Sequence, residues 1–367
     1  MSRDFDSPAA LTRRILATLG LVVLADACFV AVLGFLLRPW LAPVLGPVGG
    51  DSAIGWTGWS AVIALAAGAL VWAQLRYTRR EALSATDARR VSESEFPELH
   101  ARLWRLARAA DVPPPDLAVA ESDVPNSFTL GDIGRGTVVV TTGLLDALSD
   151  DELDAVLAHE LAHLRNRDAT VMTLATFLPA LANDEYALLS SVGTGTRRLA
   201  LGVAAVLGYA VSTALVPAPA FSLVSLVAFG GFVALTVLFG GVALGLLAIP
   251  VVVLSGRLSR YRELVADRAG ALLAGDPVAL ATALETLDES VPDRPETDVR
   301  AGGVRELCVH PYGVVRRDES EPQRSRPDPL AGLPLDVETH PPTEERIRRL
   351  RALAAEGTDA YGSDDTS

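Results

Sequence analysis

Three residues near the middle of the chain have the types and spacing of a metal-dependent hydrolase. His159, Glu160 and His163 form the pattern His-Glu-x-x-His. Residues four apart lie on one face of an α-helix, so both imidazoles can reach a single ion. Imidazole is a good zinc ligand, and two ligands from one helix leave positions for a third protein ligand and a water molecule. Glu160 can take a proton from that water, so the pattern predicts a hydrolytic zinc centre. A chance arrangement of two unrelated histidines is disfavoured, because the chain has only 5 histidines.

The residues around this pattern predict the helix that it requires. Ser149 and Glu152 are spaced as a capping box, in which two side chains satisfy backbone groups at a helix N-terminus. The acidic residues between 150 and 154 suit the positive end of the helix dipole. Apolar residues follow at helical spacing, namely Leu153, Val156, Leu157, Leu161 and Leu164.

A third metal ligand must come from another part of the chain. Glu263 and Asp267 lie four residues apart in a segment with helical character. One of them can bind the metal while the other accepts a hydrogen bond from the free N–H of a metal-bound imidazole. Spacing alone leaves the choice open, and acids four apart more often mark the solvated face of a helix.

Four apolar segments indicate that the chain is partly embedded in a membrane. Its mean hydropathy of +0.30 is high for a soluble protein, whereas 21% charged residues are too many for a protein wholly in lipid. Residues 15–37 and 53–75 each exceed the roughly 20 residues that cross a bilayer as a helix. Residues 199–216 and 221–254 form a second pair, with prolines in the turn between them. These segments predict four transmembrane helices in two hairpins.

Arginines flank both hairpins at their outer ends. They are Arg13, Arg14, Arg76, Arg79, Arg80, Arg197, Arg198, Arg257 and Arg260. The positive-inside rule places these flanks, and the His-Glu-x-x-His helix between them, in the cytoplasm. The first apolar segment is too long for the core of a cleaved signal peptide, so we expect it to remain as an anchor in the cell membrane.

The membrane segments divide the chain into parts. We expect transmembrane hairpins at residues 1–80 and 199–256, and a catalytic domain built from residues 81–198 and 257–356. An acidic, disordered tail is expected at residues 357–367. A long insert, rich in proline, arginine and acids, is expected at residues 291–338.

The catalytic part has the pattern of a small α+β domain. Residues 117–120 and 137–141 indicate short strands, with another extended stretch at 124–131. Ser92 and Glu95 form a further capping-box pattern that predicts the start of a helix. An edge strand can bind an extended peptide by main-chain pairing, although an ordinary hairpin edge fits equally well. The expected fold class is a multi-pass α-helical membrane protein with a mainly α, α+β zincin-like metalloprotease domain.

The soluble parts of the chain are strongly acidic. The formal net charge is −13, and the 32 basic residues are all arginine. Residues 81–168 hold 17 of the 45 acids and residues 261–367 hold 22. This balance excludes a nucleic-acid-binding protein, which needs a basic surface. It fits a salt-rich cytoplasm that screens self-repulsion, so we predict a halophilic, haloarchaeal source. A GC-rich gene would explain the missing lysine but not the excess of acids.

Four motifs follow one another in a recognisable order. They are residues 125–131 (Pro-Asn-Ser-Phe-Thr-Leu-Gly), residues 159–168 with His-Glu-Leu-Ala-His and Asn-Arg-Asp, residues 262–267 (Arg-Glu-Leu-Val-Ala-Asp) and residues 339–347 (Thr-His-Pro-Pro-Thr-Glu-Glu-Arg-Ile). Together they resemble the HtpX-type membrane zinc endopeptidases, gluzincins that are related to the CAAX prenyl proteases. The resemblance runs from about residue 90 to about residue 350, with two hairpins where that family has them.

The resemblance implies a metal site with assigned roles. One Zn(II) ion per chain would be bound by His159, His163 and Glu263, with Glu160 as the general base. Asp267 would hold a zinc-bound imidazole from outside the ligand set.

The resemblance also implies how substrate is held. In the family the histidine of the His-Pro-Pro stretch, here His340, faces the active site and helps to stabilise the oxyanion. Ser127 and Leu130 depart from the small residues that are common in the family, which bears on the shape of the substrate groove. The implied substrate strand includes Asn126, Ser127, Phe128 and Thr129.

The favoured function is that of a membrane-embedded zinc endopeptidase that cleaves misfolded or damaged membrane proteins. Its expected partners are polypeptide substrates and the lipid bilayer. One alternative is CAAX-type processing of lipidated peptides, although that branch has more membrane segments. Another is an inactive membrane scaffold, although a chain that has lost activity usually loses a residue such as Glu160, which is intact here.

Overall fold

The protein is represented by a computed structural model that describes residues 8–45, 56–130, 136–167, 171, 174–175, 194–290, 308–309 and 340–362. The chain divides into two compact units. The first unit consists of Met1–Leu19, Gln74–Phe177 and Val252–Ser367, and the second of Gly20–Ala73 and Leu178–Val251. Apart from residues 308–309, the insert predicted at 291–338 lies outside the described residues.

The first unit contains a four-stranded mixed sheet with the order β1-β2-β4-β3. Strand β2 runs parallel to β4, while β1 and β3 pair antiparallel to β2 and β4. The two predicted strands and the third extended stretch are confirmed, whereas β1 was not predicted because its Ala-Arg-Arg sequence lacks apolar alternation. The strands are β1 (Ala88–Arg90), β2 (Asp116–Ala120), β3 (Ser127–Leu130) and β4 (Thr137–Thr141).

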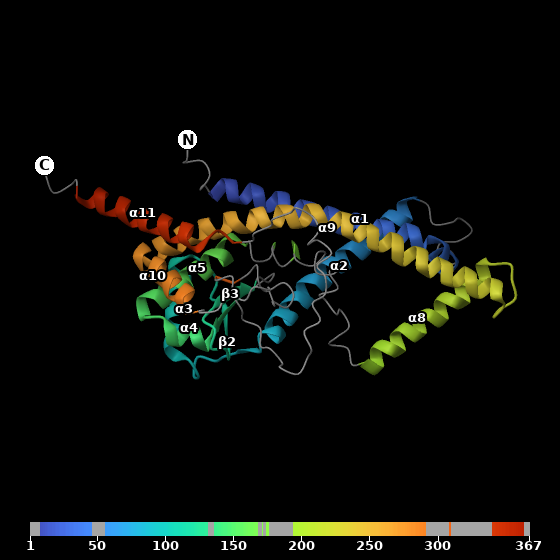
Figure 1. The fold of residues 1–367 in the computed structure, drawn as a ribbon, viewed down its shortest axis with the longest axis horizontal. Helices are drawn as coiled ribbons and strands as arrows, with labels where there is room; N and C mark the ends of the chain where they lie inside the picture. Colours follow the sequence, from blue (N-terminus) through green and yellow to red (C-terminus); the bar gives the residue numbers. More distant parts are fainter. Residues whose placement is uncertain are drawn as a thin grey trace. The chain divides into compact units, whose positions relative to one another are not determined.

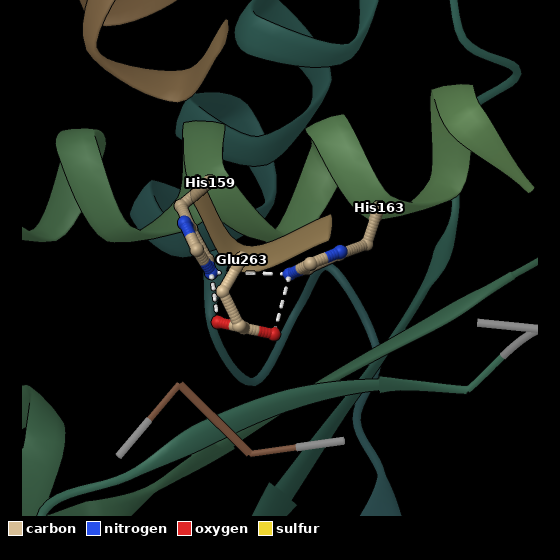
Figure 2. Close-up of side chains that lie close together, drawn as sticks. All are labelled: His159, His163 and Glu263. Carbon is tan, nitrogen blue, oxygen red and sulfur yellow. Dashed lines mark hydrogen bonds and ion pairs between the residues drawn. The ribbon is translucent and has the colours of Figure 1, made fainter. Parts of the chain in front are cut away.

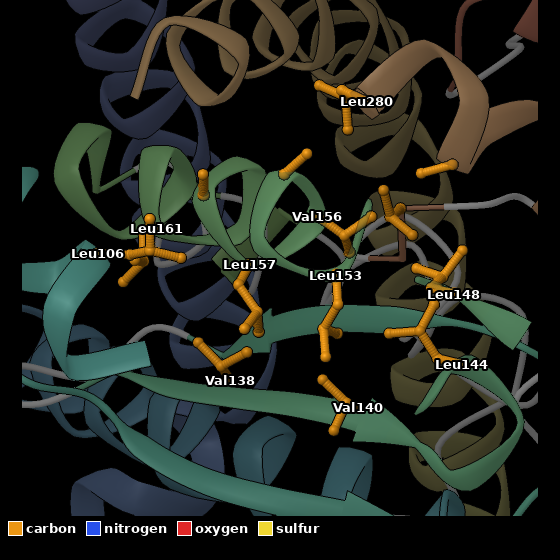
Figure 3. Packing of buried hydrophobic residues seen from close by; sticks show 14 of the residues in the cluster. Leu106, Val138, Val140, Leu144, Leu148, Leu153, Val156, Leu157, Leu161 and Leu280 are labelled. Carbon is orange, nitrogen blue, oxygen red and sulfur yellow. The ribbon is translucent and has the colours of Figure 1, made fainter. Parts of the chain in front are cut away.

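Helix α5 (Asp150–Asn166) lies on one face of this sheet. Its N-terminus has the predicted capping box, in which the Glu152 carboxylate accepts hydrogen bonds from the Ser149 amide and hydroxyl. Figure 3 shows Leu153 and Leu157 directed from α5 toward the strand residues Val138 and Val140. The short helix α4 (Thr142–Ala147) precedes α5. Helices α3 (Pro97–Ala109) and α10 (Pro277–Glu289) pack against α5 (Figure 1).

The opposite face of the sheet belongs to a second apolar cluster. Side chains alternate along each strand, so Ala118, Phe128 and Val139 lie in this cluster while their neighbours point toward α5. Leu11 and Leu258 pack against them. The sheet is therefore covered on both faces, which is why short strands with little polar alternation are stable here.

Helix α3 begins later than the capping-box pattern predicts. Ser92 and Glu95 do interact, since the Glu95 carboxylate accepts hydrogen bonds from the Ser92 amide and hydroxyl. These bonds close a turn before the helix, which starts at Pro97. The reason is that Pro97 suits the first helical position, where its missing N–H costs no hydrogen bond.

Helix α9 (Leu223–Ala274) is a single helix of 52 residues. The apolar segment predicted at 221–254 and the predicted helical segment around Glu263 are parts of this one helix. Residues 255–262 contain no proline, and neither Gly256 nor Pro250 ends the helix.

Four helices carry the predicted membrane segments. They are α1 (Pro8–Leu45), α2 (Trp56–Ala85), α8 (Thr194–Leu215) and α9. Within the described residues, two helices are long and apolar enough to cross a membrane, Ala10–Arg38 and Leu223–Ala274. In the most apolar stretch of each of these two helices, only 17% is buried, which argues against core helices of a soluble protein. The described apolar parts of α2 and α8, Ser60–Gln74 and Leu201–Thr213, are shorter than the roughly 20 residues that span a bilayer. The expected count of four is thus corrected to two on this criterion.

Helix α11 (Thr343–Gly362) follows the His-Pro-Pro stretch and packs against α10. It extends to Gly362, so residues 357–362 are helical rather than part of the predicted disordered tail. Gly357 weakens a helix by only about 1 kcal/mol relative to alanine, which is too little to end it. Residues 363–367 lie outside the described residues.

Candidate metal centre

Three side chains from two helices converge on one point in the first unit. His159 and His163 project from α5 and Glu263 from α9 (Figure 2). The Nε2 atoms of the two histidines are 3.1 Å apart, and each lies 3.6 Å from a different carboxylate oxygen of Glu263. All three residues are buried. The predicted i, i+4 histidine pair therefore meets the carboxylate from a segment about one hundred residues later.

The spacing of these atoms fits a bound metal ion. An ion with bonds of about 2.1 Å at tetrahedral angles holds its ligand atoms about 3.4 Å apart. Both Glu263 oxygens are buried without a hydrogen-bond partner among the described residues. Such an atom costs about 1–3 kcal/mol or more unless another group satisfies it, and coordination of a cation would do so. The residues present thus fit a metal ligated by two imidazoles and a carboxylate.

Asp267 lies behind the first histidine rather than among the ligand atoms. Its Oδ1 is 3.0 Å from His159 Nδ1, the ring nitrogen opposite the one that faces Glu263. Burial lowers the pKa of His159, but the Asp267 and Glu263 carboxylates outweigh burial and raise this pKa to about 9. A metal must therefore displace a proton from this imidazole in the metal-free protein. The choice that spacing leaves open, between Glu263 and Asp267, is made by this geometry.

Gly270 allows the two ligand-bearing helices to approach each other. A Cβ atom at this position would lie 2.7 Å from the backbone nitrogen and Cα of His159. Atoms of the backbone cannot turn aside as a flexible side chain can, so any larger residue would push α9 away from α5. Gly270 lies on the same stretch of α9 as Glu263 and Asp267, and its role could not be inferred from one sequence.

Glu160 lies beside the ligands and is held by strand β3. Ser127 Oγ donates a hydrogen bond of 2.6 Å to Glu160 Oε1, and Thr129 Oγ1 donates one of 2.5 Å to Oε2. Residues 127 and 129 share one face of the strand, so both hydroxyls point toward α5. These two hydrogen bonds fix the direction of the Glu160 carboxylate. All three residues are buried.

The other predicted substrate residues have different surroundings. Phe128 points away from Glu160 into the apolar cluster on the far face of the sheet. Asn126 is buried, and its side-chain oxygen accepts a hydrogen bond from the Ser127 amide. The outer edge of β3 is partly covered, since Cys308 forms an antiparallel bridge to Phe128 and the Val309 amide donates to the Ser127 carbonyl at 2.9 Å. Burial raises the pKa of the Cys308 thiol, and the charge of Glu160 adds to that effect.

His340 is buried just before α11, and among the described residues the group of possible metal ligands does not include it.

Arg346, 6 positions after His340, is a residue to which the sequence analysis gave no role. Arg346 is buried and reaches Asp267 with two nitrogens, at 2.8 and 2.6 Å. The only signal for it in the sequence is its place in the fourth motif.

The known proteins to which this chain is similar are peptidases. Residues 93–354 match peptidase family M48. The chain is 33% identical to Protease HtpX homolog 1 of Streptomyces coelicolor over 97% of both chains. It is 34% identical to Protease HtpX homolog 2 of Methanosarcina mazei over 80% of this chain and 85% of that one. It is also 34% identical to Protease HtpX homolog of Pyrococcus furiosus over 75% and 79%.

Proposed function

The chain belongs to peptidase family M48, and from that premise we propose that it is a membrane-embedded, zinc-dependent endopeptidase. The observation that carries the proposal is the placement of Glu160 next to a buried group of two imidazoles and one carboxylate. A metal site with three protein ligands leaves a position for water and substrate, as catalytic zinc sites do. The proposed ion is one Zn(II) per chain, held by His159, His163 and Glu263.

The chain's own residues then divide the work of peptide hydrolysis. Zinc, when bound, supplies Lewis-acid chemistry that polarises a carbonyl group and acidifies water. Glu160 accepts a proton from the attacking water on a carboxylate oxygen and passes it to the leaving amine. Ser127 and Thr129 keep this carboxylate aimed, because each donates a hydrogen bond to one of its oxygens. His340 is proposed to stabilise the oxyanion, on the strength of the family resemblance alone.

The substrates we propose are unfolded or damaged membrane proteins that reach the site as extended segments. Main-chain pairing beside β3, at residues 126–129, would hold such a segment without reading its sequence. The segment would have to be accommodated beside Cys308, which already pairs with Phe128. This arrangement suits an enzyme that removes many different chains rather than one that processes a single peptide.

The strictest test of this function is the variant Glu160→Gln. It keeps the three ligands, so it should bind zinc like the wild type in detergent. Cleavage of an unfolded test chain such as casein should fall by about 10²-fold or more, because removal of a general base typically costs that much. Proteolysis at the wild-type rate by this variant would show that the activity comes from a contaminant or that Glu160 is not the base. Absence of both zinc and turnover in the wild type would support an inactive scaffold instead.

We further propose that the chain is a multi-pass protein of the cell membrane, with its catalytic domain in the cytoplasm. Two helices support this by length and hydropathy, and the flanking arginines support the orientation. A cysteine introduced near residue 45 should be labelled from outside intact cells, whereas one near residue 100 should be labelled only after lysis. The reverse pattern would exclude this topology.

A further inference from the structure

We propose that Arg346 is a positioning residue for the metal centre, acting on His159 through Asp267 and on strand β3 through Val309. The proposal rests on the proposed function and extends it to a residue that touches no ligand atom closely. Its nearest approach to a ligand is 3.7 Å, between Nη2 and an oxygen of Glu263. Its hydrogen bonds go to the Asp267 carboxylate and the Val309 carbonyl, which lie outside the proposed set of metal ligands.

The first contact fixes the direction of the Asp267 carboxylate. Arg346 Nε donates to Oδ2 at 2.8 Å and Nη2 donates to Oδ1 at 2.6 Å, so the guanidinium binds both oxygens as a fork. Oδ1 is also the atom that lies 3.0 Å from His159 Nδ1. A carboxylate held at both oxygens cannot turn away from the imidazole, and the orientation of that ring sets where Nε2 points.

The charge of Arg346 is a further reason to place this residue in the support of the metal centre. Glu160, Glu263 and Asp267 bring three carboxylates into a buried region, where uncompensated charge is costly. Arg346 is itself buried, and an arginine guanidinium is not deprotonated in proteins. The guanidinium therefore stays positive next to the site and offsets part of the carboxylate charge before any cation binds.

Another contact of Arg346 leads to strand β3, beside which we propose that substrate binds. Arg346 Nη1 donates a hydrogen bond of 2.7 Å to the Val309 carbonyl. The amide of Val309 in turn donates to the Ser127 carbonyl, and Ser127 holds Glu160. One side chain on α11 thus connects the carboxylate behind a metal ligand with the strand that holds the general base.

The experiment compares three variants of the full-length protein in detergent. Arg346→Gln removes the charge and the fork, while Arg346→Lys keeps the charge but cannot bind two oxygens in one plane. Arg349→Gln is the matched control, because Arg349 lies on the same helix, is exposed and pairs with Glu345. For each we would measure the melting temperature, zinc affinity by competition with a chelator, and the visible absorption spectrum of the Co(II)-substituted protein.

Arg346→Gln should bind zinc roughly 10–100-fold more weakly, which is the usual cost of removing an outer partner of a metal ligand. Its Co(II) spectrum should change, since the spectrum reports the geometry of the ligands. Arg346→Lys should keep a melting temperature closer to that of the wild type and still show the altered spectrum, and Arg349→Gln should match the wild type throughout.

Wild-type zinc affinity and an unchanged Co(II) spectrum in Arg346→Gln would overturn the positioning role. If that variant does not fold, a wild-type spectrum and affinity in Arg346→Lys would overturn it equally, because charge alone would then suffice. Neither outcome touches the proposed function, which depends on zinc binding and turnover by the wild type. Failure of the wild type to bind zinc would instead remove the proposed function and this inference together.

Discussion

The two halves of helix α9 follow opposite rules of burial. In the half that belongs to the second unit, large apolar side chains are exposed, among them Leu223, Val227, Val237 and Leu246. In the half that belongs to the first unit, Arg262, Glu263 and Asp267 are charged and buried. Water would penalise the first pattern and an apolar core would penalise the second.

The surroundings, and not the residue type, therefore decide which side chains this helix buries. Exposed apolar residues are favourable where lipid surrounds a helix. Buried charges are tolerable where each has a partner, and here the partners are histidines, arginines and a proposed cation. Substitutions on the two halves should therefore have different free-energy costs.

The largest effect is expected at Glu263, the buried charge that we place on the metal. Glu263→Ala should lose zinc and activity together, and zinc affinity should fall by more than the roughly 10²-fold that removal of an outer partner can cost. His340→Ala should keep full zinc while kcat falls by roughly 10²-fold, because it would act only in the transition state. Zinc analysis and steady-state kinetics measure both. Zinc loss from the His340 variant, with full zinc in the Glu263 variant, would reverse the two assignments.

An intermediate effect is expected from a charge in the apolar half. Val237→Arg places a cation on a residue that is 69% exposed, near the middle of residues 223–251. In lipid this should cost about 2.5–3.5 kcal/mol of insertion free energy and reduce the protein recovered in the membrane fraction. Leu272→Arg is the matched control, since Leu272 is 61% exposed in the other half and its substitution should cost less than about 0.5 kcal/mol. Equal recovery of both variants would mean that the apolar half does not face lipid.

A smaller effect is expected from Gly270, where the charged half approaches α5. Gly270→Ala should destabilise the protein by about 1–3 kcal/mol, as overpacking does, and weaken zinc binding by moving Glu263. Gly241, where an added Cβ has open space, is the control, because Gly241→Ala should be neutral or slightly stabilising. Melting curves and chelator competition would test this. Unaltered stability and zinc affinity in Gly270→Ala would contradict the close approach of the helices.

The smallest effect per residue is expected when the salt concentration is changed. Salt should screen the exposed carboxylates and leave the buried ones nearly unaffected. The net charge of −13 should make the melting temperature rise between about 0.1 M and 3 M KCl, because salt screens repulsion between exposed acids. The buried contacts of Glu263 and Asp267 should change little, so zinc affinity should stay nearly constant. A melting temperature indifferent to KCl would remove the support for a halophilic source.

Local signals in the sequence were sufficient for the parts of the site that lie on one element. The capping box at Ser149 and the spacing of His159 and His163 define a helix face without reference to the rest of the fold. The choice of Glu263 over Asp267 required tertiary geometry, because both lie on the same face of one helix. The reach of Arg346 across 79 positions to Asp267 has no local pattern at all.

The boundaries of secondary-structure elements were harder to predict from the sequence than the residues of the candidate metal site. The start of α3 at Pro97 depends on competition between adequate local choices, which spacing does not resolve. The edge of β3 is another case. Nothing in the sequence around Cys308 indicates that this residue pairs with Phe128, since an isolated bridge has no repeating pattern.

Pro250 gives α9 a built-in point of low stiffness. Proline has no N–H, so the hydrogen bond to the carbonyl four residues earlier cannot form, and its ring crowds that carbonyl. Proline is one of the few positions at which long helices kink sharply. The chain passes from the second unit to the first between Val251 and Val252, immediately after this proline. Pro250 lies more than three helical turns before Glu263, so a bend at this proline would leave the turns that carry Glu263, Asp267 and Gly270 to move as one piece.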